Sequence, residues 1–211
     1  MARSVNLARE DELIQKAIRL FSRGGFQETS LQQIANELAI TRPLFYYYFE
    51  SKEDLLWRII GHLGDGLLEQ AEPIAIAAEG PPERLRLIFE KHIETLIENI
   101  DAFRIYFAER HLLTGKRDLR IKRGEVRYHD LIAEIVAEGQ QLHKFRDGDP
   151  HFLTRLSVGT ANSPLRWYRP SGSMAPRETI VAIADFILAG LAPEAGDPPE
   201  APCGDPPETP C

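Results

Sequence analysis

Residues 29–52 decide the fold of the N-terminal part, and they read Thr-Ser-Leu-Gln-Gln-Ile-Ala-Asn-Glu-Leu-Ala-Ile-Thr-Arg-Pro-Leu-Phe-Tyr-Tyr-Tyr-Phe-Glu-Ser-Lys. Ser30 or Thr29 can cap a short helix, because Gln33 or Gln32 follows at the spacing of a capping box. Apolar residues then recur at helical spacing, at Leu31, Ile34, Ala35 and Leu38. Two short helices joined by a tight turn at 39–41 are expected.

The second helix of this pair is predicted to present polar and aromatic side chains outward. Thr41 can cap it, and Pro43 is tolerated because first-turn N–H groups have no partner within the helix. Phe45 and Phe49 should face inward, which leaves Arg42, Leu44 and tyrosines 46–48 to project elsewhere. A helical hairpin with these tyrosines in its core is the alternative. Three successive residues span most of a helix circumference, however, so at least one tyrosine must be exposed. The pattern favours a helix–turn–helix that reads a DNA major groove.

Charge is distributed unevenly along the 211 residues. The net charge is −7, but residues 193–211 hold five acids and no base. Residues 1–50 hold six bases and six acids, which suits a reader that binds phosphate through a few placed side chains and helix N-termini. Residues 193–211 also repeat Asp-Pro-Pro-Glu-x-Pro-Cys, and we expect a disordered acidic tail that holds both cysteines, Cys203 and Cys211.

The rest of the chain is also expected to be helical, and we predict an all-α protein of about nine helices. We expect a helix–turn–helix DNA-binding domain over residues 1–50, a ligand-binding and dimerisation domain over 51–192, and the tail over 193–211. The predicted helices run over about 8–23, 31–38, 41–49, 51–73, 83–99, 101–113, 117–145, 151–168 and 176–191. The helix that starts at Ser51 should join the two domains as one rod, and Pro164 should kink a later helix.

Motifs of enzymes and metal sites are missing from the sequence. It contains no phosphate-cradling glycine loop, no His-Glu-x-x-His, no Gly-x-Ser-x-Gly and no Cys-x-x-Cys. We therefore predict no catalytic residues, no metal and no cofactor, and we do not expect an enzyme. Without a signal-peptide core or an apolar run long enough for a bilayer, we expect a cytoplasmic protein without membrane partners.

Residues 8–60 resemble the DNA-binding domain of the tetracycline-repressor (TetR) family. The resemblance rests on Ala17-Ile18-Arg19-Leu20-Phe21, Gly25-Phe26, Thr29-Ser30, Ile34-Ala35, Tyr46-Tyr47, Phe49 and 51–56, Ser-Lys-Glu-Asp-Leu-Leu. It implies a homodimeric repressor that binds a palindromic double-stranded operator and leaves it when an effector binds. The DNA-binding residues that it implies are Ser30, Gln32, Thr41, Arg42, Pro43, Leu44, Tyr46, Tyr47, Tyr48 and Lys52.

Within this resemblance, Arg42, Pro43 and Leu44 are expected to face base edges, and Gln32 could reach a base. Phosphate contacts are expected from Tyr46, Tyr48, Ser30 and Lys52. Tyr47 could contact a base or a sugar. Leu44 stands where the family more often has a small or hydroxyl residue, and Tyr48 stands where histidine is usual.

The C-terminal part from Asn162 to Leu191 resembles TetR-family regulators of fatty-acid and sterol catabolism, which respond to acyl-CoA thioesters. The resemblance rests on residues 167–172, Trp-Tyr-Arg-Pro-Ser-Gly, on Ala184-Asp185-Phe186 and on Gly190-Leu191. It implies a hydrophobic effector, with an acyl-CoA as the candidate, and the last two helices as the dimer interface. We predict a pocket lined by Phe89, His92, Phe103, Tyr106, Phe107, Arg110, Tyr128 and Trp167.

Four alternatives stay open for these features. His92 could be an ordinary core histidine, and the basic stretch at 116–127 could be a solvated helix face instead of a landing site for a phosphorylated ligand. The effector could be a flat hydrophobic drug, with an efflux gene as the regulated target. A helical enzyme or lipid carrier is a remote alternative.

Overall fold

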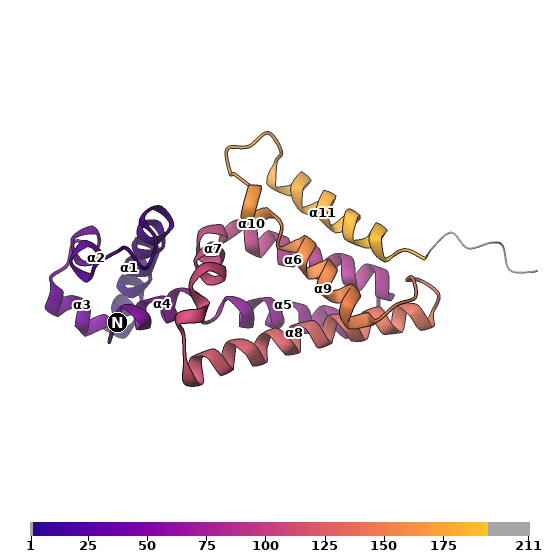
Figure 1. Ribbon diagram of the computed structural model, residues 1–211, viewed down its shortest axis with the longest axis horizontal. Helices are drawn as coiled ribbons and strands as arrows, with labels where there is room; N and C mark the ends of the chain where they lie inside the picture. The colour runs from indigo at the N-terminus through magenta and orange to yellow at the C-terminus, as the bar shows by residue number, and fades with distance from the viewer. Residues whose placement is uncertain (1, 194–211) are drawn as a thin grey trace, which may run out of the picture.

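The computed structural model describes residues 2–193, and every regular element in this range is a helix (Figure 1). The all-α prediction is confirmed. The helices are α1 Ala2–Gly24, α2 Leu31–Glu37, α3 Arg42–Tyr48, α4 Lys52–Ile60, α5 Leu63–Ala75, α6 Pro81–Glu98, α7 Ile100–Glu109, η1 Arg110–Leu112 (a 3-10 helix), α8 Gly115–Gln141, α9 Pro150–Ala161, α10 Pro164–Trp167 and α11 Pro176–Leu191.

Helices α1 to α4 form a head at one end of an elongated molecule, and α5 to α11 form the body (Figure 1). Local sequence sets the ends of the head helices as predicted. Ser30 caps α2 in a reciprocal capping box with Gln33, and the Thr41 hydroxyl accepts a hydrogen bond from the Leu44 N–H at 3.3 Å. Thr29 is buried instead, and its hydroxyl donates to the Gly25 carbonyl at 2.6 Å.

The apolar residues of the head meet in one core. Phe45 and Phe49 are buried there, so the prediction that they face inward is confirmed. The core also takes residues from α4 and α7, which tie the head to the body. Its buried members include Leu13, Ala17, Phe21, Phe26, Ile34, Leu38, Leu55, Leu56, Ile59, Ile60, Ala102, Ile105 and Tyr106. The domain boundary at residue 50 stays a prediction. Helix α4 follows that boundary in sequence, yet its apolar residues pack in the head core.

Gly25 ends α1 in the left-handed conformation, with φ at 76°, and its N–H donates to the Phe21 carbonyl at 2.9 Å. We expect Gly25→Ala to lower the free energy of unfolding by about 1 kcal/mol, because a Cβ disfavours this conformation. Urea denaturation measures the change. Gly24→Ala is the matched control, since Gly24 is helical and an added Cβ would meet only the Thr29 hydroxyl oxygen at 3.5 Å. Equal losses in the two variants would contradict this account.

The predicted rod over 51–73 is two helices, which corrects the sequence-based boundary. The chain breaks at Gly61-His62, where a Cβ at Gly61 would lie 2.4 Å from the indole of Trp57. Pro73 lies inside α5, which continues to Ala75. The predicted helix over 151–168 is also divided, because α9 ends at Ala161 and Pro164 begins the short α10. Residues 2–193 therefore hold more helices than the nine predicted, because two of the predicted helices are each divided into two shorter ones.

The body is a bundle in which α6 packs against α5, α8 and α11, while α8 also packs against α5 and α9. Its core holds apolar residues from all five helices, among them Leu68, Leu85, Phe89, Ile132, Val136, Leu153 and Ile183. Gly139 on α8 lets the Phe145 ring approach closely, since an added Cβ would lie 2.0 Å from a ring carbon. Helix α7 contacts α1 and α4 of the head as well as α6.

The predicted tail, with Cys203 and Cys211, lies outside the described residues. Over the described part of the chain, no helix is both long and apolar enough to cross a membrane.

Candidate nucleic-acid interface and ligand pocket

Helix α3 presents an exposed row of candidate DNA contacts. Tyr47 is 68% exposed, Tyr46 49% and Leu44 41%. Arg42 is also exposed, and no residue within 9–193 forms a hydrogen bond or ion pair with its guanidinium. Tyr48 is half-buried and packs against the head core. At least one tyrosine is therefore exposed, as predicted, and the alternative with all three in a core is excluded.

The other candidate contacts flank α3. Gln32 is exposed on α2, where its amide donates to Asn36 Oδ1 at 2.9 Å. Ser30 is exposed at the N-terminus of α2, and Pro43 occupies the first turn of α3. Lys52 begins α4, and its ammonium donates to the Gln27 carbonyl at 3.2 Å while lying 4.3 Å from the centre of the Phe26 ring. Partial burial lowers the pKa of Lys52. The ammonium retains further N–H donors for a phosphate.

Asp54 joins the head to the body. Its side chain is 5% exposed, and Arg117 of α8 donates to Oδ1. Oδ2 accepts from the backbone N–H of Glu50 at 3.2 Å, directly after α3 and its cap. Arg120 pairs with Asp65 at 2.6 Å, and both arginines lie against the Trp57 ring. One carboxylate thus holds the end of α3, the start of α4 and the start of α8 together.

These contacts bear on the basic stretch of residues 116–127, because four of its six bases pair with carboxylates. The pairs are Arg117–Asp54, Arg120–Asp65, Lys122–Asp118 and Arg127–Glu72. Lys116 and Arg123 are exposed, and neither forms an ion pair with the residues over 9–193. The stretch is mainly a paired helix face, which agrees with the solvated-face alternative.

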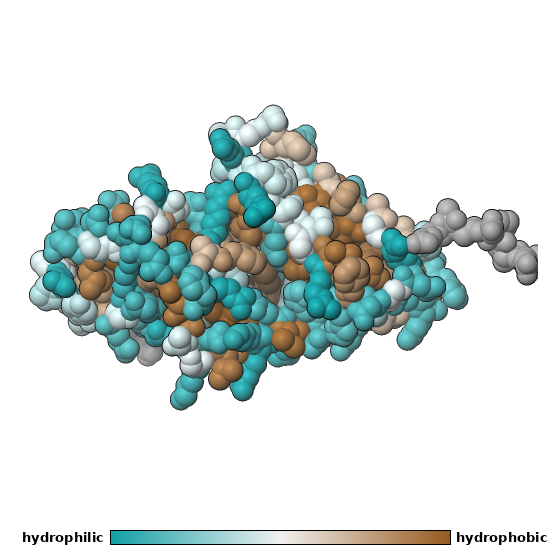
Figure 2. Space-filling view, in the orientation of Figure 1, coloured by the Kyte–Doolittle hydropathy of each residue, from teal (hydrophilic) through white to brown (hydrophobic). Residues whose placement is uncertain are grey.

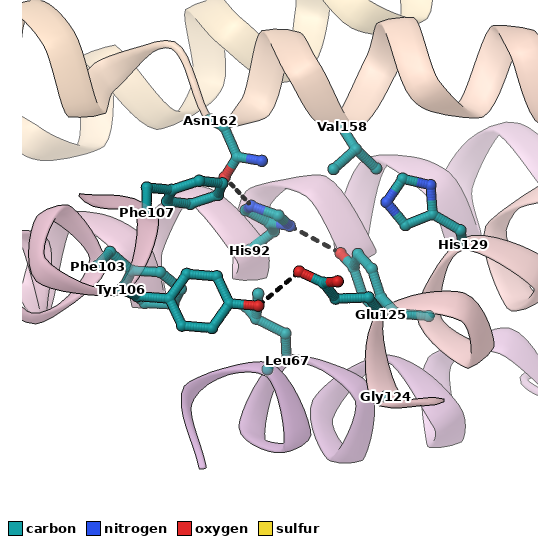
Figure 3. Close-up of a pocket in the computed structure, with 12 residues that line it drawn as sticks. Leu67, His92, Phe103, Tyr106, Phe107, Gly124, Glu125, His129, Val158 and Asn162 are labelled. Atoms are coloured by element: carbon teal, nitrogen blue, oxygen red, sulfur yellow. Dashed lines mark hydrogen bonds between the residues drawn. The ribbon is translucent and has the colours of Figure 1, made fainter. Parts of the chain in front are cut away.

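The body contains an apolar pocket between α5, α6, α7, α8 and α9 (Figure 3). The cavity measures about 110 Å³. Five predicted residues line it, namely His92, Phe103, Tyr106, Phe107 and Tyr128. The sequence did not indicate the others, which are Gly64, Leu67, Gly124, Glu125, His129, Val158 and Asn162. They come from helices whose neighbours could not be read from sequence periodicity.

A chain of hydrogen bonds crosses one wall of the pocket. His92 Nδ1 lies 2.8 Å from the Tyr128 hydroxyl, and His92 Nε2 lies 3.1 Å from Asn162 Oδ1 (Figure 3). Burial lowers the pKa of His92 to about 4, so its ring is neutral at pH 7. Burial also raises the pKa of Tyr128. His92 is buried with both ring nitrogens hydrogen-bonded, and it also lines the pocket. The interpretation of His92 as a core histidine and its interpretation as a pocket residue are therefore compatible.

A second polar group lies on the wall formed by α7 and α8. The Tyr106 hydroxyl donates to Glu125 Oε1 at 2.6 Å, and Arg110 donates to the same carboxylate. Burial, followed by the bond to Glu125, raises the pKa of Tyr106. The Arg110 guanidinium also lies 5.4 Å from the centre of the Tyr106 ring. Because Tyr106 belongs both to this pocket and to the head core, it connects the two.

Three predicted pocket residues lie elsewhere. Phe89 is fully buried in the body core, where it packs between helices and does not line the pocket. Arg110 does not line the pocket, and it forms an ion pair with the lining residue Glu125. Trp167 is 50% exposed on the outer face, because its neighbour Tyr168 takes the inward position beside Leu96 and Phe103. Arg104 fixes this turn by donating to the carbonyls of Leu165 and Tyr168 at 3.0 and 2.9 Å.

An apolar surface covers the outer side of α9 and α11 (Figure 2). Its exposed members are Phe152, Leu156, Trp167, Met174 and Phe186, and several of them border a groove between the two helices. Single exposed apolar residues are common, but a contiguous group of this kind marks an interaction surface. In the described part of the chain, no group of three or more histidine, cysteine, aspartate or glutamate residues could hold a metal ion.

Comparison with protein families gives two matches that together span most of the described chain. Residues 13–59 match the bacterial regulatory proteins of the tetR family, and residues 78–191 match the tetracyclin repressor-like C-terminal domain. The second match alone covers more than half of the chain.

Individual proteins resemble the chain over nearly its whole length. The HTH-type transcriptional repressor KstR2 of Mycolicibacterium smegmatis is 26% identical over 196 residues, which cover 90% of this chain and 94% of that protein. The crystal structure of PfmR from Thermus thermophilus has a TM-score of 0.78 and 29% identity, covering 85% of this chain and 98% of PfmR. The structure of AibR in complex with isovaleryl coenzyme A and operator DNA has a TM-score of 0.73 and 25% identity, covering 87% and 98%.

Proposed function

The chain belongs to the tetR family of bacterial regulatory proteins, and on that premise we propose that it is a homodimeric transcriptional repressor whose DNA binding is relieved by a small hydrophobic effector. The observation that carries the proposal is the exposed face of α3, where Arg42 and two tyrosines offer polar groups without partners among residues 9–193. Such groups on a helix of this motif are suited to base edges and phosphates.

The apolar surface on α9 and α11 supports the homodimer. Two copies that pack these helices together would cover Phe152, Leu156 and Phe186, whose exposure otherwise costs free energy. A two-fold dimer places its two heads in successive major grooves of a near-palindrome.

The pocket supports a link between effector and DNA. Tyr106 lines the pocket and packs in the head core, and its helix α7 contacts α1 and α4. An effector that displaces Tyr106 or its carboxylate partner would move α7 against the head. If it binds better to a state whose two heads no longer match successive grooves, it releases DNA.

We propose an acyl-CoA as the leading effector, supported by the likeness to AibR, whose structure contains isovaleryl coenzyme A. The aromatic lining from Phe103, Tyr106, Phe107 and Tyr128 favours a second candidate, a flat hydrophobic drug. Thermal shifts with acyl-CoAs, their free acids and planar drugs separate the two. Shifts with the CoA esters alone support the first candidate, and shifts with the planar compounds alone support the second.

The test of this function uses the full chain and DNA from its own promoter region. We expect the protein to retard this DNA at low salt, and isovaleryl-CoA to release it. In Val158→Phe the added ring would fill the cavity, so the variant should retain DNA binding but lose release. Val126→Phe is the matched control, because Val126 is 60% exposed on the outer face of α8. Failure of the unmodified protein to retard the DNA would refute the proposed function.

A further inference from the structure

The position of the Asn162 amide oxygen assigns a direction to the hydrogen bonds along the pocket wall. Asn162 Oδ1 faces His92 Nε2, so Nε2 carries the ring proton and donates it to that oxygen. Since the neutral ring has a single N–H, Nδ1 accepts the hydrogen bond from the Tyr128 hydroxyl. Donation therefore runs from Tyr128 through His92 to Asn162.

This direction leaves the Asn162 amide nitrogen available to a ligand. Figure 3 shows the amide oxygen of Asn162 turned to His92, and the amide nitrogen turned away from that ring toward the side of Val158. No described residue accepts a hydrogen bond from this nitrogen. The pocket thus presents a donor whose orientation is set by the hydrogen bond of its own amide oxygen, and apolar side chains such as Val158 line the pocket beside it.

The charges around the pocket disfavour an anionic ligand group. The lining residues include no lysine or arginine, and both lining histidines have a pKa lowered by burial. The Glu125 carboxylate also lines the pocket, and its ion-pair partner Arg110 stands outside the lining. A ligand carboxylate would lose its hydration without gaining an opposite charge.

The size of the cavity limits the group that enters. An apolar cavity of about 150 Å³ in another protein binds benzene. The cavity here measures about 110 Å³, so it suits a branched chain or ring of similar or smaller size.

We propose that the pocket recognises a small, uncharged carbonyl group, with the Asn162 amide N–H as the donor to the carbonyl oxygen and the aromatic walls around a short branched chain. This inference rests on the proposed function, because it names the chemical class of the effector at the same site. Ketones, esters and thioesters share this chemistry, and carboxylates do not.

Three probes of one shape test the inference in the absence of DNA. They are 4-methylpentan-2-one, 3-methylbutanoate and 2,4-dimethylpentane, which differ only in the polar group. Titrations of the full chain monitored by ligand NMR give the affinities. We expect the ketone to bind at least about tenfold more tightly than the carboxylate, because both can accept the Asn162 hydrogen bond but only the carboxylate must lose the hydration of a charge. The ketone should also bind more tightly than the alkane, which cannot accept that hydrogen bond.

A substitution assigns the donor. In Asn162→Leu the affinity for the ketone should fall about tenfold, while the affinity for the alkane should stay within about twofold. Asn99→Leu is the matched control, since Asn99 is exposed at the end of α6 and its side chain donates to the Thr95 carbonyl, away from the pocket, and it should leave both affinities unchanged.

Equal or tighter binding of the carboxylate would overturn the proposal, and so would an Asn162→Leu variant that keeps its preference for the ketone. Absence of binding by all three probes would overturn it as well. Each of these results would leave retardation of promoter DNA untouched, so failure of this inference is distinguishable from failure of the proposed function.

Discussion

Replacing Asp54 with alanine should lower the free energy of unfolding by about 3 kcal/mol. The Asp54 side chain is 5% exposed and holds three partners, namely the Glu50 N–H, Arg117 and, at 3.9 Å, Arg58. Breaking a buried ion pair by removing one partner costs about 3–5 kcal/mol. We take the lower end, because the Arg117 side chain is 34% exposed and can be hydrated when its partner is lost.

The same substitution should weaken DNA binding, because the Glu50 N–H follows α3 directly and Asp54 fixes its position. Urea denaturation and DNA titration measure the two effects. Asp54→Asn keeps an acceptor for that N–H. Its free energy of unfolding and its affinity for DNA should therefore lie between those of the alanine variant and the unmodified protein.

Glu53→Ala provides the control, since Glu53 is an exposed carboxylate in the same first turn of α4. It loses only a favourable helix-dipole contact, worth about 0.3–1 kcal/mol. If Glu53→Ala costs as much as Asp54→Ala, the tie between head and body contributes no stability, and our account of Asp54 is wrong.

Arg42→Ala should relax sequence preference and weaken binding to the operator by about 1–3 kcal/mol, the value of a bidentate contact to a base. Arg42 is exposed at the start of α3, and the guanidinium can donate two parallel hydrogen bonds to guanine. Fluorescence anisotropy with operator and unrelated duplexes, each at several salt concentrations, measures the effect. Binding to unrelated DNA should change little.

Tyr46→Phe serves as the contrast, because a lost bond from the Tyr46 hydroxyl to a phosphate should weaken binding to every sequence by a similar factor. Arg19→Ala, which removes an exposed charge from α1, controls for the net charge of the head. If Arg42→Ala instead weakens all sequences alike and reduces the salt slope by about one, Arg42 contacts phosphate and the assignment is reversed.

Local signals explain why the head was predictable from sequence. The caps at Ser30 and Thr41 act within three residues, and the inward pair Phe45 and Phe49 follows from helical spacing. Each of these features is complete within one or two turns of chain. The break at Gly61-His62 was not predicted as a helix end, and the close approach of the Trp57 ring to Gly61 is a packing contact that sequence periodicity does not show.

The pocket was only partly predictable. Periodicity placed His92, Phe103 and Tyr106 on inward faces, but it could not show which helix each face meets. His92 forms a hydrogen bond with Asn162, which lies seventy positions later in the sequence. Glu125 accepts a hydrogen bond from Arg110, which lies before the turn that leads into α8. Trp167 was predicted to line the pocket, but the turn at α10 leaves it half exposed and places its neighbour Tyr168 inward.

The sequence by itself determined the helical class of residues 2–193, the caps and core of the head, and the exposed face of α3, because hydrogen bonding and amphipathic spacing act over a few residues. Only the tertiary structure decided which polar groups meet in the pocket. Packing of α6 against α8 and α9 brings His92 between Tyr128 and Asn162, and burial there keeps the ring neutral. The donor that this arrangement offers to a ligand is therefore a property of the fold and not of any motif.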